Sequence, residues 1–183
     1  MSVIELELAR VRTRWDWSDG MIAQIKQIVG PLMLGAAPLD MDQNQNTDLC
    51  IIAGRDIRIA ARVRGPGYFE KYPYEVTIRS HGLVRAEVEI SKIMAGLGDW
   101  FFYGHANDQD KIHAWWLIDL AVFRNVLNGH KHGTGPKIDF SRKVNKDGTE
   151  FVAFDLRSFP AEPSVLVASS HPLPLKIDHA NNR

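Results

Sequence analysis

Arginine side chains recur at regular positions along a short part of this sequence and indicate anion-binding chemistry. Arg58, Arg62 and Arg64 lie two or four residues apart in a segment where polar and apolar residues alternate, and Arg79 lies in the next alternating segment. Because neighbouring side chains of a β-strand point to opposite faces, this spacing predicts that the arginines share one face of a sheet. Guanidinium groups bind phosphate oxygens well, so such a face would suit phosphate or nucleic acid.

Aromatic residues lie between the two arginine-bearing segments, where they could stack against nucleic-acid bases. They are Tyr68, Phe69, Tyr72 and Tyr74. The alternative is a ladder of arginines that Asp56, Glu75 and helix acids neutralise, without any ligand. We favour nucleic-acid contact, made by Arg58, Arg62, Arg64 and Arg79.

The arginines need strands to hold them in line. Alternation predicts strands over residues 56–64 and 74–80, and an apolar run predicts a third over residues 47–53. We expect the three strands to be neighbours in one sheet, with their registers fixed because a slip of one residue would expose every apolar side chain. The side chains expected on the buried face are Ile57, Ile59, Val76 and Ile78.

Helices are predicted where apolar residues recur at three- and four-residue spacing. One helix begins at the capping pair Ser18-Asp19 and ends near residue 30. A second is expected over residues 84–95 and a third over residues 112–127.

A strand and a hairpin complete the expected fold. An aromatic run predicts a strand over residues 99–105, and an Asp-Gly pair between residues 138–144 and 150–156 predicts a hairpin. The result is an α/β fold with an α-β-β-β-α-β core, a mixed sheet flanked by helices, and a C-terminal helix and β-hairpin. We expect one domain over residues 1–160 and an extended, proline-containing tail over residues 161–183.

This element order resembles the core of the PD-(D/E)xK phosphodiesterase superfamily, which includes restriction endonucleases and Holliday-junction resolvases. In that superfamily an acid on the first core strand and a (D/E)-x-K element on a later strand bind one or two divalent metal ions. The resemblance implies that Asp48 and Glu75 are catalytic residues that bind Mg²⁺ or Mn²⁺. The ion would polarise a phosphate and activate water to attack it.

The sequence departs from the superfamily's pattern at the lysine, because Thr77 occupies that position. The nearest substitute is the segment Glu89-Ile90-Ser91-Lys92 on the predicted helix, and members are known in which the lysine or the second acid has moved there. Glu89 and Lys92 are three residues apart and share a helix face. The resemblance therefore implies that Glu89 is a further metal ligand and that Lys92 or Arg79 stabilises the charge on the reacting phosphate.

Each of these residues also has an ordinary structural interpretation. Asp48 could cap the start of a strand, and Glu75 could pair across the sheet with Arg62 or Arg79. Glu89 and Lys92 could form a surface pair of the kind that exposed helices carry.

The composition is that of an ordinary globular protein without an overall charge bias. The 22 basic and 22 acidic side chains cancel, although residues 55–92 hold eight basic residues against five acids. The single cysteine cannot form an internal disulfide, and we expect neither a signal peptide nor a segment that spans a membrane. These features predict a cytoplasmic protein that does not contact membranes.

The resemblance implies a metal-dependent DNA phosphodiesterase of the kind found in a phage, prophage or defence context. An inactive protein on the same fold that binds nucleic acid or a protein partner, such as an inhibitor or accessory factor, is the main alternative. A third is an assembly protein that forms a homodimer through its aromatic surfaces. The histidines and the one cysteine lack the spacing of a structural zinc site.

Overall fold

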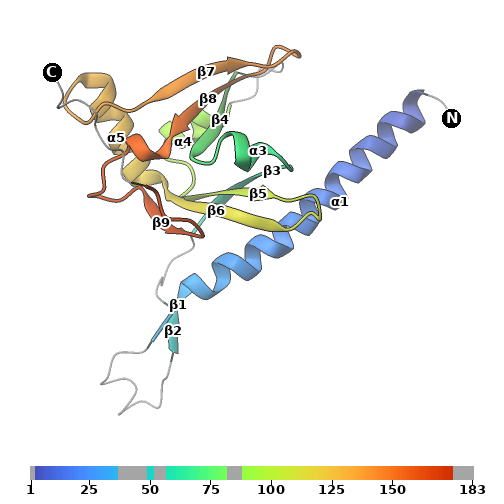
Figure 1. Cartoon of the computed structure of the whole chain (residues 1–183), viewed down its shortest axis with the longest axis horizontal. Coiled ribbons are helices and arrows are strands. Elements are labelled where there is room, and N and C mark those ends of the chain that lie inside the picture. The colour runs from blue at the N-terminus through green and yellow to red at the C-terminus, as the bar shows by residue number, and fades with distance from the viewer. Residues whose placement is uncertain (1–2, 37–48, 52–56, 82–87, 175–183) are drawn as a thin grey trace.

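The computed structural model describes residues 3–36, 49–51, 57–81 and 88–174. It begins with the long helix α1 (Val3–Val29), a 3₁₀ turn (Gly30–Met33) and a two-stranded antiparallel ribbon of β1 (Leu34–Ala36) and β2 (Leu49–Ile51). The rest of the described chain forms two sheets and three shorter helices, which confirms the predicted α/β class (Figure 1).

The central sheet is mixed and has the strand order β3-β5-β6-β9. β3 runs parallel to β5, and the remaining pairs are antiparallel. Its strands are β3 (Ile59–Arg64), β5 (Trp100–Ala106), β6 (Ile112–Asp119) and β9 (Leu166–Ser169).

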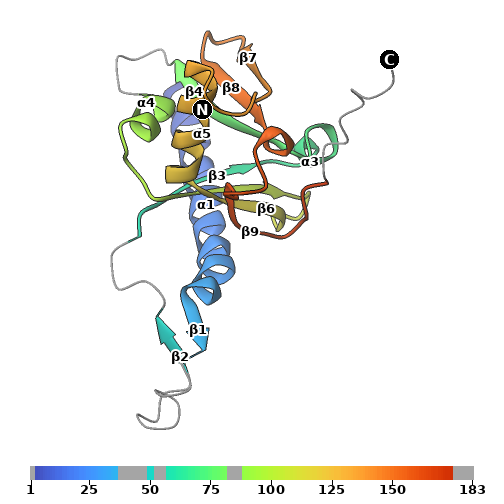
Figure 2. The ribbon, with the colours of Figure 1, turned by 90° about the vertical axis from the view of Figure 1, so that its left-hand side faces the viewer.

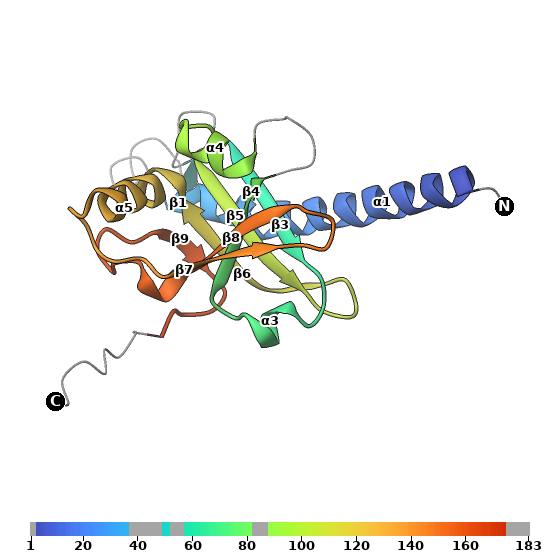
Figure 3. The same cartoon turned by 90° about the horizontal axis from the view of Figure 1, so that it is seen from above.

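The second sheet is antiparallel, with the order β4-β8-β7, and it packs over one face of the central sheet. Figure 2 shows β7 and β8 above β3, β6 and β9. The strands are β4 (Glu75–His81), β7 (Phe140–Val144) and β8 (Glu150–Asp155). The helices around them are α3 (Tyr68–Lys71), α4 (Glu89–Met94) and α5 (Leu120–His132), as Figure 3 shows from above.

The two faces of the central sheet have separate cores. One face packs against α1, where Ile25 and Val29 contact Phe102 and Leu117. The other face packs against the second sheet and α5 in a larger cluster that includes Val76, Ile78, Phe101, Trp116, Phe123 and Phe154. The molecule is therefore layered as α1, central sheet and second sheet.

The expected row of three neighbouring strands is wrong. The strands predicted over residues 47–53, 56–64 and 74–80 correspond to β2, β3 and β4, which lie in three different sheets. The buried face that we expected these strands to share is therefore split: Ile59 packs on the α1 side, and Val76 and Ile78 belong to the other core. The connection through α3 carries the chain from the central sheet to the second sheet, so β3 pairs with β5 and β4 pairs with β8.

The predicted helix over residues 112–127 is half wrong, because its first eight residues form strand β6. Helix α5 begins only after Asp119, whose carboxylate caps it by accepting hydrogen bonds from the backbone N–H groups of Ala121 and Val122. It continues to His132 and ends at Gly133, which is in the left-handed conformation. The aromatic and β-branched residues of this segment suit a strand once β5 lies beside them.

Other predictions are confirmed, some with changed bounds. The aromatic strand and the C-terminal hairpin are present as β5 and as β7 with β8. Helix α1 begins well before the predicted capping pair, and α4 begins only at Glu89, because Val88 before it is extended. The expected tail is extended over residues 166–169, but there it joins the central sheet as β9. Among the described helices, none is both long and apolar enough to cross a membrane.

Candidate functional site

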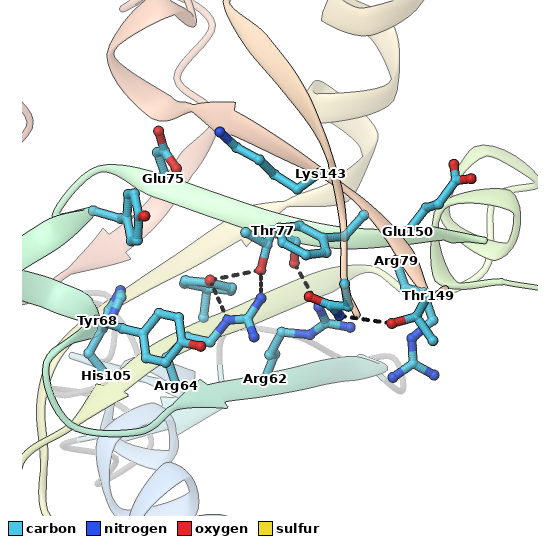
Figure 4. Close-up of a pocket in the computed structure, with 14 residues that line it drawn as sticks. Arg62, Arg64, Tyr68, Glu75, Thr77, Arg79, His105, Lys143, Thr149 and Glu150 are labelled. Atoms are coloured by element: carbon cyan, nitrogen blue, oxygen red, sulfur yellow. Dashed lines mark hydrogen bonds between the residues drawn. The ribbon is translucent and has the colours of Figure 1, made fainter. Parts of the chain in front are cut away.

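A cleft of about 500 Å³ lies between the arginine-bearing edge of the central sheet and the second sheet. Its walls come from β3 and β5 on one side and from β4, α3 and the β7–β8 hairpin on the other (Figure 4). The side chains that line it include Arg62, Arg64, Tyr68, Tyr72, Glu75, Thr77, Arg79, Tyr103, His105, Lys143, Glu150 and Phe151.

Arg64 is held in the cleft by groups from both sheets. Its Nε donates a hydrogen bond of 2.9 Å to the hydroxyl of Tyr103, and its Nη2 donates to the hydroxyl of Thr77. The two hydroxyl oxygens are themselves 3.0 Å apart. These bonds use two of the five guanidinium N–H groups, so Arg64 keeps its orientation while its Nη1 group can donate to a ligand.

Arg62, which is also half-buried, is held in a similar way. Its Nη1 donates to the backbone carbonyl of Thr77 at 3.1 Å, and its Nη2 pairs with Glu89 at 2.5 Å. The same Glu89 oxygen accepts a 3.0 Å hydrogen bond from the backbone N–H of Arg79. Burial lowers the pKa of Arg62, and the negative charge of Glu89 acts in the opposite direction. Glu89 therefore fixes Arg62 and the adjoining part of β4.

Arg79 and Lys143 add positive charge from the wall that the second sheet forms. Both side chains are exposed, and they come from β4 and β7. The cleft lining thus carries four cationic residues against the carboxylates of Glu75 and Glu150, an excess of two charges. Counting Glu89 with its partner Arg62 reduces that excess to one. The cleft is positive although the whole chain has a net charge of zero.

The predicted nucleic-acid-binding arginines are brought together only in part. Arg62, Arg64 and Arg79 meet in the cleft, but from opposite walls rather than from adjacent strands of one sheet. Arg58 lies before β3, is exposed, and pairs with Asp99 at 3.2 Å. It does not line the cleft.

The predicted metal and catalytic residues are less well assembled. Glu75 lines the cleft, whereas Glu89 is engaged with Arg62 and Lys92 is exposed on α4 outside the cleft lining. Asp48 lies outside the described residues, so its position relative to Glu75 stays a prediction. Within the described ranges, no group of three or more histidine, cysteine or acidic side chains could hold a metal ion.

Tyrosines flank the arginines at the mouth of the cleft. Tyr68 and Tyr72 are 47% and 44% exposed, and the Cζ atom of Arg64 lies 5.4 Å from the centre of the Tyr68 ring. The other two aromatic residues predicted to stack do not reach the cleft lining. Phe69 packs against the rings of His105 and Trp116, and Tyr74 packs on the core beneath Arg157.

His105 lines the end of the cleft that carries Tyr68 (Figure 4). It is buried, and neither ring nitrogen has a hydrogen-bond partner among the described residues. Burial, with a smaller contribution from the neighbouring His113, lowers the pKa of His105 to about 4. The ring is therefore neutral near pH 7.

Sequence reasoning missed several residues that build this site. Thr77 was compared with a motif lysine, but its hydroxyl and carbonyl orient the two arginines. Tyr103 belonged to the aromatic run that predicted a strand, and Lys143 belonged to the predicted hairpin; neither was assigned to the site. Alternation along β7 could have placed Lys143 on one face, but only the packing of the two sheets turns that face toward Arg64.

No protein-family model, curated protein or solved structure matches this chain. The chemistry of the cleft must therefore itself support any functional proposal.

Proposed function

We propose that this chain binds nucleic acid by holding phosphate groups in the cleft between its two sheets. The observation that carries the proposal is the convergence of Arg62, Arg64, Arg79 and Lys143 from three strands, with two of the guanidinium groups held in fixed orientations. An arginine whose orientation is already fixed loses less conformational entropy when it binds an anion. The inactive binding protein is thus the alternative from the sequence that the geometry supports best.

Phosphate is a better match for this cleft than a carboxylate ligand. Several cationic groups surround one space, so a ligand with charges at repeated intervals can contact more than one of them. Arg79 and Lys143 lie at separate positions along the cleft (Figure 4), so a chain of phosphates could contact both. The remaining carboxylates, Glu75 and Glu150, lie at opposite ends of the β4–β8 ladder and leave its middle positive.

Salt-dependent binding by charge-removal variants tests this function. We expect Arg79→Ala and Lys143→Ala each to weaken the binding of a labelled oligonucleotide in fluorescence anisotropy. Each should also reduce the slope of log affinity against log salt by about one, because one phosphate contact is lost. Both side chains are exposed, so neither change should affect folding.

Arg142→Ala is the matched control, because Arg142 is exposed on β7 next to Lys143 but does not line the cleft. It removes the same charge from the same strand and should leave the salt slope close to the wild-type value. Equal effects of the Lys143 and Arg142 variants would contradict a defined site. Failure of the wild-type protein to bind any oligonucleotide at low salt would reject the function.

Metal-dependent cleavage of DNA is the second candidate, favoured by the position of Glu75 in the cleft beside the phosphate-binding groups. If it is correct, Asp48→Asn and Glu75→Gln should abolish cleavage that requires Mg²⁺ or Mn²⁺ while oligonucleotide binding in EDTA persists. The amide nearly matches the carboxylate in size but is a poorer ligand for these ions. The measurement is cleavage of several DNA forms with metal and with EDTA. Binding without cleavage in any metal would leave the chain a binding protein.

A further inference from the structure

We infer that the nucleic acid held in this cleft is single-stranded, with its bases stacked on Tyr68 and Tyr72. The inference rests on the proposed phosphate-binding function and adds the class of ligand. It comes from a different set of observations, namely the exposure and position of the two tyrosines.

The side chains of Tyr68 and Tyr72 are exposed where they line the cleft. Tyr68 belongs to α3 and Tyr72 follows it directly, so both lie on one wall at the mouth of the cleft. Nearly half of each side chain is accessible, whereas Phe69 between them is packed into the ring cluster around His105. Helix α3 therefore packs one aromatic residue against the core as an anchor and presents the two others to the cleft.

The guanidinium of Arg64 and the ring of Tyr68 lie close enough together for one nucleotide to contact both. The guanidinium of Arg64 lies 5.4 Å from the centre of the Tyr68 ring, and Figure 4 shows the two side chains next to each other at the same end of the cleft. A phosphate bound to the outer N–H groups of Arg64 would carry its sugar and base toward the tyrosines. Stacking on aromatic rings combined with cationic contacts is the common mode of single-strand binding.

A duplex would not satisfy both sets of groups. In a duplex the base faces are covered by their neighbours, so a protein reaches only base edges in the grooves. The cleft has a volume of about 500 Å³, which is the size of a site for a small molecule rather than a groove that accepts a double helix. Phosphates on the outside of a duplex could still contact Arg79 and Lys143, but the tyrosines would be left without partners.

The experiment compares strands that differ only in whether they carry bases. Fluorescence anisotropy at one low salt concentration would measure affinity for a short oligothymidylate, an abasic strand with the same phosphates, and a duplex of equal length. We expect the wild-type protein to prefer the strand with bases over both others. In Tyr68→Leu and Tyr72→Leu this preference should fall by about five-fold or more for each ring lost, since leucine keeps apolar bulk without a stacking face.

Phe140→Leu is the control, because Phe140 is an exposed aromatic residue on β7 outside the cleft lining. It should keep the wild-type preference, and Tyr68→Phe with Tyr72→Phe should keep it too because the rings remain. Oligouridylate and thymidine monophosphate show whether RNA or a free nucleotide is accepted.

The outcomes separate the inference from the function on which it rests. Equal wild-type affinity for the thymidylate and abasic strands, or a preference that survives in both leucine variants, overturns base stacking but leaves phosphate binding in place. Preference for the duplex also overturns it. No binding of any strand rejects both proposals.

Discussion

His105 illustrates at the scale of one residue how burial changes chemistry. Its side chain is 1% exposed and is surrounded by the rings of Phe69, Tyr103 and Trp116. Neither ring nitrogen forms a hydrogen bond with a described group, so the ring packs as a flat, neutral core residue below the cleft. Protonation of His105 would also place a positive charge near Arg64 and His113.

Acid should therefore destabilise the fold through His105. The pKa is about 4 in the folded protein against 6.5 for an ordinary histidine, so between these values the unfolded chain binds a proton that the folded protein does not. The loss of unfolding free energy begins as the pH falls through 6.5, reaches about 2 kcal/mol near pH 5, and levels off below the folded pKa. Between pH 7 and pH 5, His105→Phe should lose about 2 kcal/mol less than the wild-type protein, as measured by urea unfolding at several pH values.

His132→Gln provides the comparison, because it removes an exposed histidine from the last turn of α5 and leaves the buried ring of His105 in place. Parallel loss of stability in the wild-type protein and in His105→Phe would show that His105 is protonated without cost in the folded state.

Helix α1 illustrates how one element is fixed by both apolar and polar contacts. Met21, Ile25 and Val29 recur at four-residue spacing and are buried, and Ile25 and Val29 pack against the central sheet. Gln24 donates to the backbone carbonyl of Asp110 at 2.7 Å and accepts from the backbone N–H of Ile112 at 2.9 Å, so it ties the helix to the β5–β6 turn. The helix thereby covers the face of the central sheet opposite the cleft.

Removing an apolar contact of α1 should cost stability without affecting ligand binding. Ile25→Ala should lower the free energy of unfolding by about 2–4 kcal/mol, because it leaves a cavity against Phe102 and Leu117. Ile22→Ala, on the exposed side of the same helix, should change it by less than about 0.5 kcal/mol. Urea unfolding measures both, and oligonucleotide binding by the folded variants should match the wild-type protein. A cost for Ile22→Ala equal to that for Ile25→Ala would contradict the docked position of α1.

At the scale of the whole molecule, the cleft exists because two sheets are stacked. β3 and β5 supply the two fixed arginines and the tyrosine hydroxyl, whereas β4 and the β7–β8 hairpin supply the threonine, the second set of cations and the opposite wall. Neither sheet has the site alone. The overall charge of zero also conceals it, because the positive excess appears only where these strands meet.

The sequence by itself determined the local features that depend on near neighbours. Alternation placed Arg62 and Arg64 on the face opposite Ile59 and Val63, and this assignment is confirmed. The Asp147-Gly148 pair correctly marked the turn of the hairpin. Such features depend on side-chain direction and turn conformation, which the residues within a few positions fix.

Only the tertiary structure decided which segments lie together and, in one case, which conformation a segment adopts. The apolar and aromatic residues of 112–119 fit either a helix or a strand, and pairing with β5 made them a strand. In the same way, the β3–α3–β4 connection leads to a different sheet, so Arg79 faces Arg64 across the cleft and does not lie on an adjacent strand of the same sheet. Strand partners are chosen by contacts between residues far apart in the chain, and alternation within a single strand does not specify them.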